Sequence, residues 1–177
     1  FAPQDGVHAI RIAAAAIAEM AIGRIGDDTT VNVGQIEGGR ASNIVPDYCE
    51  VSGELRSFSH KKALEELAKV EQIFAKEAEK RGGSIEFIRD ICYQAYKTDE
   101  NESVVKEFQK ACMACGIKSS LIATFGGSDQ NKMSEHGIPG IVMASAMHQV
   151  HSCQEYTEVS EMAQVAGIVS ELLQMKE

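Results

Sequence analysis

Two histidines and a carboxylate stand close together at positions 148 to 155, directly after an apolar run. The run, residues 138–146, predicts a buried strand, which places His148, His151 and Glu155 in the loop at its carboxyl end. In α/β proteins ligands bind at that edge of the sheet, and a neutral imidazole is the commonest protein metal ligand. The pattern therefore predicts a metal site with His151 as ligand. Glu155 would orient the imidazole ring of His151 or form part of the wall of the site. His148 would lie behind His151, outside the metal's own ligands, or face solvent.

A polar loop without a metal is the alternative that this spacing leaves open. The segment is not the helical His-Glu-x-x-His motif, in which two histidines one turn apart bind zinc. A second loop could also bind a ligand. Gly126, Gly127 and Ser128 stand between a predicted strand and a predicted helix, where glycines admit a ligand to main-chain amides and a helix start favours an anion. The alternative is a plain turn in which Ser128 or Asp129 caps the helix.

Asn43 and Arg56 are the other two candidate binding residues. Arg56 stands near the end of a predicted strand whose residues alternate between its two faces. Its guanidinium could bind a carboxylate through two parallel hydrogen bonds. Asn43 lies in the turn before that strand. An exposed arginine and a turn asparagine without a ligand are the alternative interpretation.

The first half of the chain must position Asn43 and Arg56, and its pattern predicts helix, strand, strand, helix, strand. These elements cover residues 6–23, 29–36, 47–57, 59–81 and 84–96. With one more strand in front, this order is a ferredoxin-like antiparallel sheet with two helices on one face.

The second half alternates helices and apolar strands, which is typical of an α/β sheet containing parallel strands. The predicted elements cover residues 102–115, 119–125, 130–136, 138–144 and 159–175. A polar stretch at residues 97–101 predicts a hinge, so we expect two domains, residues 1–96 and 97–177.

Composition narrows the classes of partner. The net charge of −9 argues against nucleic acid or an anionic membrane surface, because both require a basic patch. No apolar run approaches the roughly 20 residues of a membrane span. Five cysteines at irregular spacing favour a reducing cytoplasm over a disulfide framework. Cys112 and Cys115 form a Cys-x-x-Cys inside a helical pattern, which predicts core thiols.

Four segments, taken in order, resemble the peptidase T-like tripeptidases of the two-zinc exopeptidase family, which also holds carboxypeptidase G and related deacylases. The segments are Glu37-Gly-Gly-Arg-Ala-Ser-Asn-Ile-Val-Pro-Asp47, Gly53-Glu-Leu-Arg-Ser57, Gly126-Gly-Ser-Asp129 and His148-Gln-Val-His-Ser-Cys-Gln-Glu-Tyr156. The resemblance implies a dimerising lid over residues 1–96 and the C-terminal portion of an α/β catalytic domain over residues 97–177. The implied activity is hydrolysis of short peptides by water activated at two zinc ions.

The same resemblance implies roles for individual residues. His151 matches the last zinc ligand. Arg56 matches a lid residue that grips a substrate carboxylate, and Asn43 one that hydrogen-bonds the substrate or its oxyanion. Gly126, Gly127 and Ser128 match the stretch lining the substrate cleft.

The other zinc ligands and the catalytic general base of the family have no match in this chain, and we expect them upstream of Phe1. A catalytic zinc takes about three protein ligands, so we expect the chain alone to be inactive. Two alternatives are a metal-dependent deacylase or amidohydrolase of the same family, and a stand-alone ferredoxin-like module that dimerises or binds small ligands.

Overall fold

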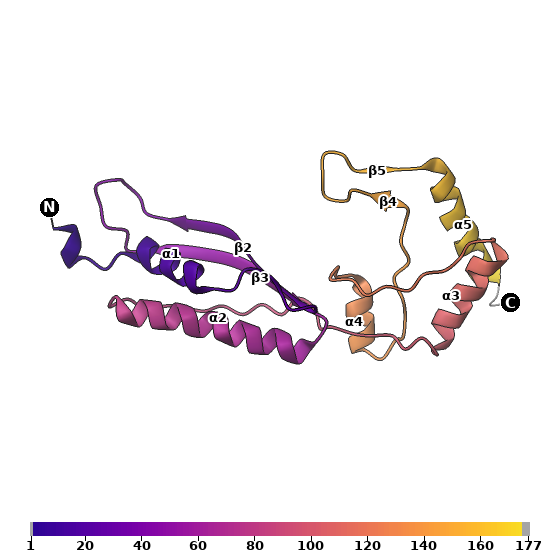
Figure 1. The fold of residues 1–177 in the computed structure, drawn as a ribbon, viewed down its shortest axis with the longest axis horizontal. Helices are drawn as coiled ribbons and strands as arrows, with labels where there is room; N and C mark the ends of the chain where they lie inside the picture. The colour runs from indigo at the N-terminus through magenta and orange to yellow at the C-terminus, as the bar shows by residue number, and fades with distance from the viewer. Residues whose placement is uncertain (1, 175–177) are drawn as a thin grey trace. The chain divides into compact units, whose positions relative to one another are not determined.

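A computed structural model of the chain describes residues 2–174. The chain divides into two compact units, Phe1–Ala95 and Tyr96–Glu177, and each is described by itself (Figure 1). The first unit comprises a 3₁₀ turn η1 (Pro3–Asp5), α1 (Ala9–Glu19), β1 (Gly23–Ile25), β2 (Thr29–Gly38), β3 (Cys49–Ser57) and α2 (His60–Lys80).

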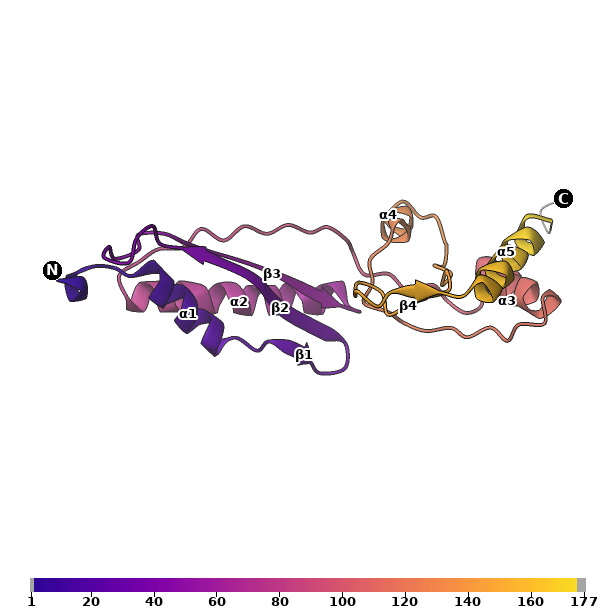
Figure 2. The same cartoon turned by 90° about the horizontal axis from the view of Figure 1, so that it is seen from above.

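The first unit is an antiparallel sheet with the strand order β1-β2-β3, covered by two helices. Figures 1 and 2 show α1 and α2 side by side along the sheet. Ala16 and Ala78 are almost completely buried, and such small side chains let two helices approach closely. The predicted antiparallel sheet with two helices on one face is confirmed. The short strand β1 was not expected.

Helix α2 begins where its sequence predicts. Ser59 is the N-cap, and its side chain accepts a hydrogen bond from the backbone N–H of Lys62, which satisfies one of the unpaired donors at a helix start. Near the other end, the Glu77 carboxylate is only 5% exposed and forms ion pairs with Lys80 and Arg81. Burying a charge is costly unless it is paired, so these cations explain how α2 carries a carboxylate on its inner side.

The second unit comprises α3 (Ser103–Ala114), α4 (Asp129–Glu135), β4 (Met147–His148), β5 (Tyr156–Thr157) and α5 (Val159–Gln174). Its core lies where α3 meets α5, and centres on Ala111, Cys112 and Ile168. Cys112 is 1% exposed and Cys115 packs against this cluster. The prediction that both are core thiols is confirmed. Met175, the last residue of the predicted final helix, lies outside the described residues.

Three predicted strands are wrong: residues 84–96, 119–125 and 138–144 form no strand. Residues 85–88 still alternate between partly buried and exposed positions, with Ile85 and Phe87 turned inward. A strand exists only where a neighbour completes its ladder of backbone hydrogen bonds, and the described residues supply no neighbour to these segments. The only sheet among the described residues of the second unit is the antiparallel pair β4–β5, not the expected parallel one.

The same segments leave large apolar side chains in solvent. Ile88 is 81% exposed, Ile122 84% and Val142 59%. Each of the three lies in one of the segments that form no strand, so each lacks the sheet neighbours that a strand residue would have.

Candidate functional site

A short hairpin in the second unit carries His151. Strands β4 and β5 pair with Met147 opposite Thr157 and His148 opposite Tyr156. The connecting loop, residues 149–155, places Gln149 and His151 at positive φ, +51° and +64°. Non-glycine residues in this region are uncommon, and they persist where surrounding contacts hold them. His151 is exposed at the turn.

Hydrogen bonds inside the loop hold that conformation. The Glu155 carboxylate accepts a bond from the backbone N–H of His151 at 2.9 Å. Ser152 Oγ donates to the carbonyl of Gln149 at 2.7 Å and accepts from the backbone N–H of Gln154 at 3.1 Å. Glu155 thus braces the backbone of His151. From the sequence, Glu155 was expected to orient the His151 ring or to form part of the wall of the site.

His148 connects the hairpin to helix α5. Its Nε2 lies 2.5 Å from a carboxylate oxygen of Glu161, in the first turn of α5. Its ring stacks on Tyr156, with centroids 4.8 Å apart and planes 17° from parallel. His148 is thus a partly buried residue that contacts both the start of α5 and the facing strand. Glu161 was missed, because only the fold brings it close to a residue thirteen positions earlier.

The described residues form no complete metal site. Within residues 2–174 no three His, Cys, Asp or Glu side chains lie together so that they could hold a metal ion. The Glu155 carboxylate is hydrogen-bonded to the backbone of His151, and the Glu161 carboxylate to the ring of His148. A catalytic zinc takes about three protein ligands, so this donor set does not fit a zinc site by itself.

Arg56 lies on the outer face of β3. Cys49, Val51 and Leu55 are turned toward the helices and partly buried, while Glu54 and Arg56 are exposed. The Arg56 guanidinium donates from Nε to Glu54 Oε1 at 3.0 Å and from Nη2 to Glu54 Oε2 at 2.9 Å. This bond to Glu54 raises the pKa of Arg56 above its ordinary value, although burial opposes the shift.

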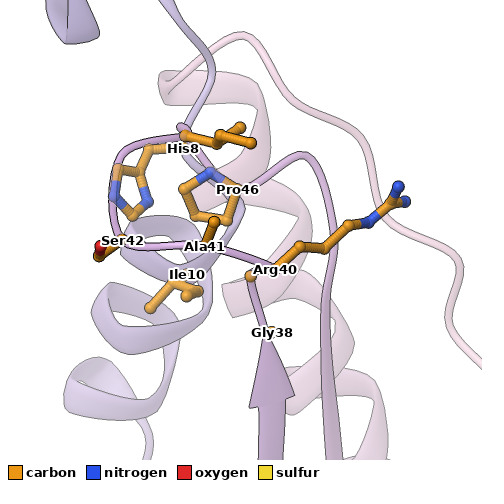
Figure 3. Close-up of a pocket in the computed structure, with 9 residues that line it drawn as sticks. His8, Ile10, Gly38, Arg40, Ala41, Ser42 and Pro46 are labelled. Atoms are coloured by element: carbon orange, nitrogen blue, oxygen red, sulfur yellow. The ribbon is translucent and has the colours of Figure 1, made fainter.

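Asn43 is exposed in the loop between β2 and β3. The same loop and the start of α1 line an open pocket of about 420 Å³. Figure 3 shows His8 and Ser42 on one side of the pocket and the Arg40 side chain extending away on the other. His8 is the N-cap of α1, and its Nδ1 accepts a bond from the backbone N–H of Arg11. Sequence reasoning missed this pocket, because the spacing of its residues has no chemical signature.

The glycine loop precedes α4. Ser128 is the N-cap of α4, and its backbone N–H donates to the Asn131 side chain at 3.0 Å. The backbone N–H of Gly126 donates to Thr124 Oγ1 at 3.1 Å. Ser128, not Asp129, is the N-cap, as in the plain turn that the sequence left open as the alternative to a binding loop. Gly126, Gly127 and Ser128 share the second unit with the His151 hairpin, whereas Asn43 and Arg56 belong to the first unit.

Residues 2–82 match a family described as the peptidase dimerisation domain, M20 type. Among curated proteins, the uncharacterized protein YqjE of Bacillus subtilis is 34% identical over 97% of this chain and 46% of its own length. The chain thus spans about half the length of the curated relative it matches.

Solved structures extend the similarity across both units. The chain resembles aminopeptidase PepT from Bacillus cereus (36% identity, TM-score 0.85, 98% of this chain and 46% of that one). It also resembles a tripeptidase from Staphylococcus aureus (30% identity, TM-score 0.91, 98% and 47%). The Bacillus subtilis YXEP protein, a dinuclear metal binding peptidase of the M20 family, shares the fold at 17% identity (TM-score 0.72, 94% and 45%).

Proposed function

We propose that this chain, in which residues 2–82 match the peptidase dimerisation domain family, is part of a zinc-dependent exopeptidase of the tripeptide aminopeptidase type. The observation that carries the proposal is the likeness to an aminopeptidase and a tripeptidase over 98% of the chain. At 98% coverage of the chain, that likeness extends beyond residues 2–82 into the second unit. The substrate is a short peptide, and two copies associate through the first unit.

His151 would supply one zinc ligand from this chain. Its exposure at the tip of a braced hairpin supports the role, since a ligand must be accessible yet held in place. One imidazole is too few for a catalytic zinc. The remaining ligands and the general base therefore come from other parts of the peptidase, and the 177-residue chain alone is inactive.

The other candidate residues would bind the peptide. Arg56 already shows the bidentate geometry with which a guanidinium grips a carboxylate. Asn43 would donate a hydrogen bond from the β2–β3 loop, and Gly126, Gly127 and Ser128 would line the cleft beside α4. His148 and Glu155 would hold the hairpin that presents His151.

The dimer and the compartment are parts of the same proposal. The match of residues 2–82 to a dimerisation domain supports a homodimer. All five cysteines are free thiols, which supports a reducing, cytoplasmic location. Within residues 2–174, none of the helices combines the length and apolar character required to cross a bilayer.

A comparison of the 177-residue chain with the full-length protein that contains it tests the proposal. With zinc and a tripeptide, the full-length protein should release the N-terminal amino acid, and the chain alone should release none. Release from an N-acyl amino acid but not from tripeptides would instead identify a deacylase. Turnover by the chain alone would contradict the assignment of the missing ligands. Sedimentation equilibrium of the chain should give the mass of a dimer, and a monomer at all concentrations would contradict the dimer.

A further inference from the structure

Arg56, the proposed carboxylate-binding residue, is already occupied by a carboxylate of its own strand. Glu54 lies two positions earlier in β3, so both side chains leave the sheet on the same face. The strand register places Glu54 opposite Asn32 and Arg56 opposite Thr30, so the two charged side chains are neighbours along β3 and not across the ladder. Glu54 therefore meets Arg56 along the strand, with hydrogen bonds of 3.0 and 2.9 Å.

The bond pattern is the one a peptide ligand would require. Two carboxylate oxygens face two N–H donors of one guanidinium edge, which is the arrangement in which arginine recognises a free carboxylate. Two carboxylates cannot use the same pair of N–H donors at once. A peptide carboxylate that takes this edge must displace Glu54, and the two negative charges then repel each other at close range.

We propose that Glu54 is a specificity-determining residue that competes with the peptide carboxylate for Arg56. This inference rests on the proposed binding role of Arg56. When no ligand is bound, the Glu54 carboxylate balances the positive charge of the guanidinium and keeps it oriented. It weakens the binding of every ligand that depends on this contact and leaves unaffected the binding of ligands without a free carboxylate.

The exposure of the pair sets the size of the effect. The side chains of Arg56 and Glu54 are 45% and 56% exposed, so water screens their attraction and displacement is easy. Exposed ion pairs contribute little, and removing the competitor should strengthen carboxylate binding by about threefold to fivefold. A buried pair would have blocked the site, whereas this exposed pair only tunes its affinity.

The test compares a tripeptide with its C-terminally amidated form as substrates of the full-length protein. Glu54→Gln removes the charge and keeps the shape of the side chain. It should lower KM for the tripeptide about threefold to fivefold, with kcat little changed and KM for the amide unchanged. The gain should shrink in high salt, because salt screens exposed charges.

Glu50→Gln is the matched control. Glu50 lies on the same exposed face of β3, and its carboxylate accepts a bond from the hydroxyl of Tyr48 at 2.9 Å. This variant removes the same charge away from Arg56 and should leave both KM values unchanged. An unchanged tripeptide KM in Glu54→Gln, or an equal change for tripeptide and amide, would overturn the inference.

Arg56→Ala separates this inference from the proposed function. If Arg56→Ala weakens the binding of the tripeptide and not that of the amide, the binding of the peptide carboxylate by Arg56 is confirmed. If that loss occurs and Glu54→Gln has no effect, only the competition by Glu54 is wrong. If Arg56→Ala weakens tripeptide and amide equally, the binding role of Arg56 is itself wrong.

Discussion

The imidazole of His148 joins the His151 hairpin to helix α5, because its Nε2 lies 2.5 Å from the carboxylate of Glu161. The opposite side of the hairpin contributes Tyr156, which stacks on the same ring. One side chain thus contacts the helix and the facing strand at once. The two-residue strands β4 and β5 offer few backbone bonds of their own, so these side-chain contacts add to the hydrogen bonds inside the loop and hold the hairpin against α5.

Removing the carboxylate from this contact should loosen the loop. Glu161→Ala deletes a partly exposed hydrogen bond, which costs about 0.5–1.5 kcal/mol. We expect faster amide hydrogen exchange in residues 147–157, measured by mass spectrometry on the 177-residue chain. Gln164→Ala, at an exposed position of the same helix, is the control. Equal exchange in the two variants would show that Glu161 does not hold the hairpin.

Stability of the first unit should fall in acid through Asp28. The Lys62 ammonium holds the pKa of Asp28 below its ordinary value. A carboxylate with a lowered folded-state pKa stabilises the fold at pH values above its unfolded-state pKa. That contribution is lost as the pH falls through the folded-state pKa. Urea unfolding at pH 7 and pH 3 should show the decrease.

Lys62→Met should make this acid dependence smaller, because the folded-state pKa of Asp28 then moves back toward its ordinary value. Lys61→Met is the control, since Lys61 is 88% exposed and lies 3.9 Å from Glu65 instead. If both variants keep the full acid dependence, the Asp28–Lys62 pair is not its source.

Two glycines in the paired strands should respond differently to alanine. A Cβ at Gly53 would lie 2.5 Å from the carbonyl oxygen of Asn32, whereas one at Gly34 would meet nothing closer than 3.9 Å. Backbone cannot yield as a flexible side chain does, so Gly53→Ala should destabilise the chain by about 1–3 kcal/mol. Gly34→Ala should stay within about 0.5 kcal/mol. Thermal unfolding measures both, and equal melting temperatures would contradict the close approach of β2 to β3.

Local signals predicted much of the first unit. Ser59 before an apolar stripe predicts the start of α2, and period-two alternation predicts which side of β3 carries Arg56. The same alternation places Glu54 on that face, so the Arg56 partner could have been found from sequence. Ile85 and Phe87 keep the pattern of a strand, yet no strand forms because the ladder depends on a neighbour that a local pattern does not reveal.

The second unit was harder to predict for the same reason. An apolar run such as residues 138–144 forms a strand only where a neighbouring strand can pair with it. No strand forms here, and Val142 is exposed. The candidate site was predicted as a list of residues rather than as contacts. The pairing of His148 with Glu161 follows from the hairpin register and the start of α5, and neither is encoded in a local spacing.

The zinc content of the full-length protein with His151→Ala tests the central claim most directly. Elemental analysis after gel filtration should show that this variant loses most of its zinc and nearly all tripeptide hydrolysis, because a catalytic site cannot spare one of about three protein ligands. His136→Ala, at the exposed end of α4, should keep both. Unchanged zinc content in His151→Ala would contradict the account.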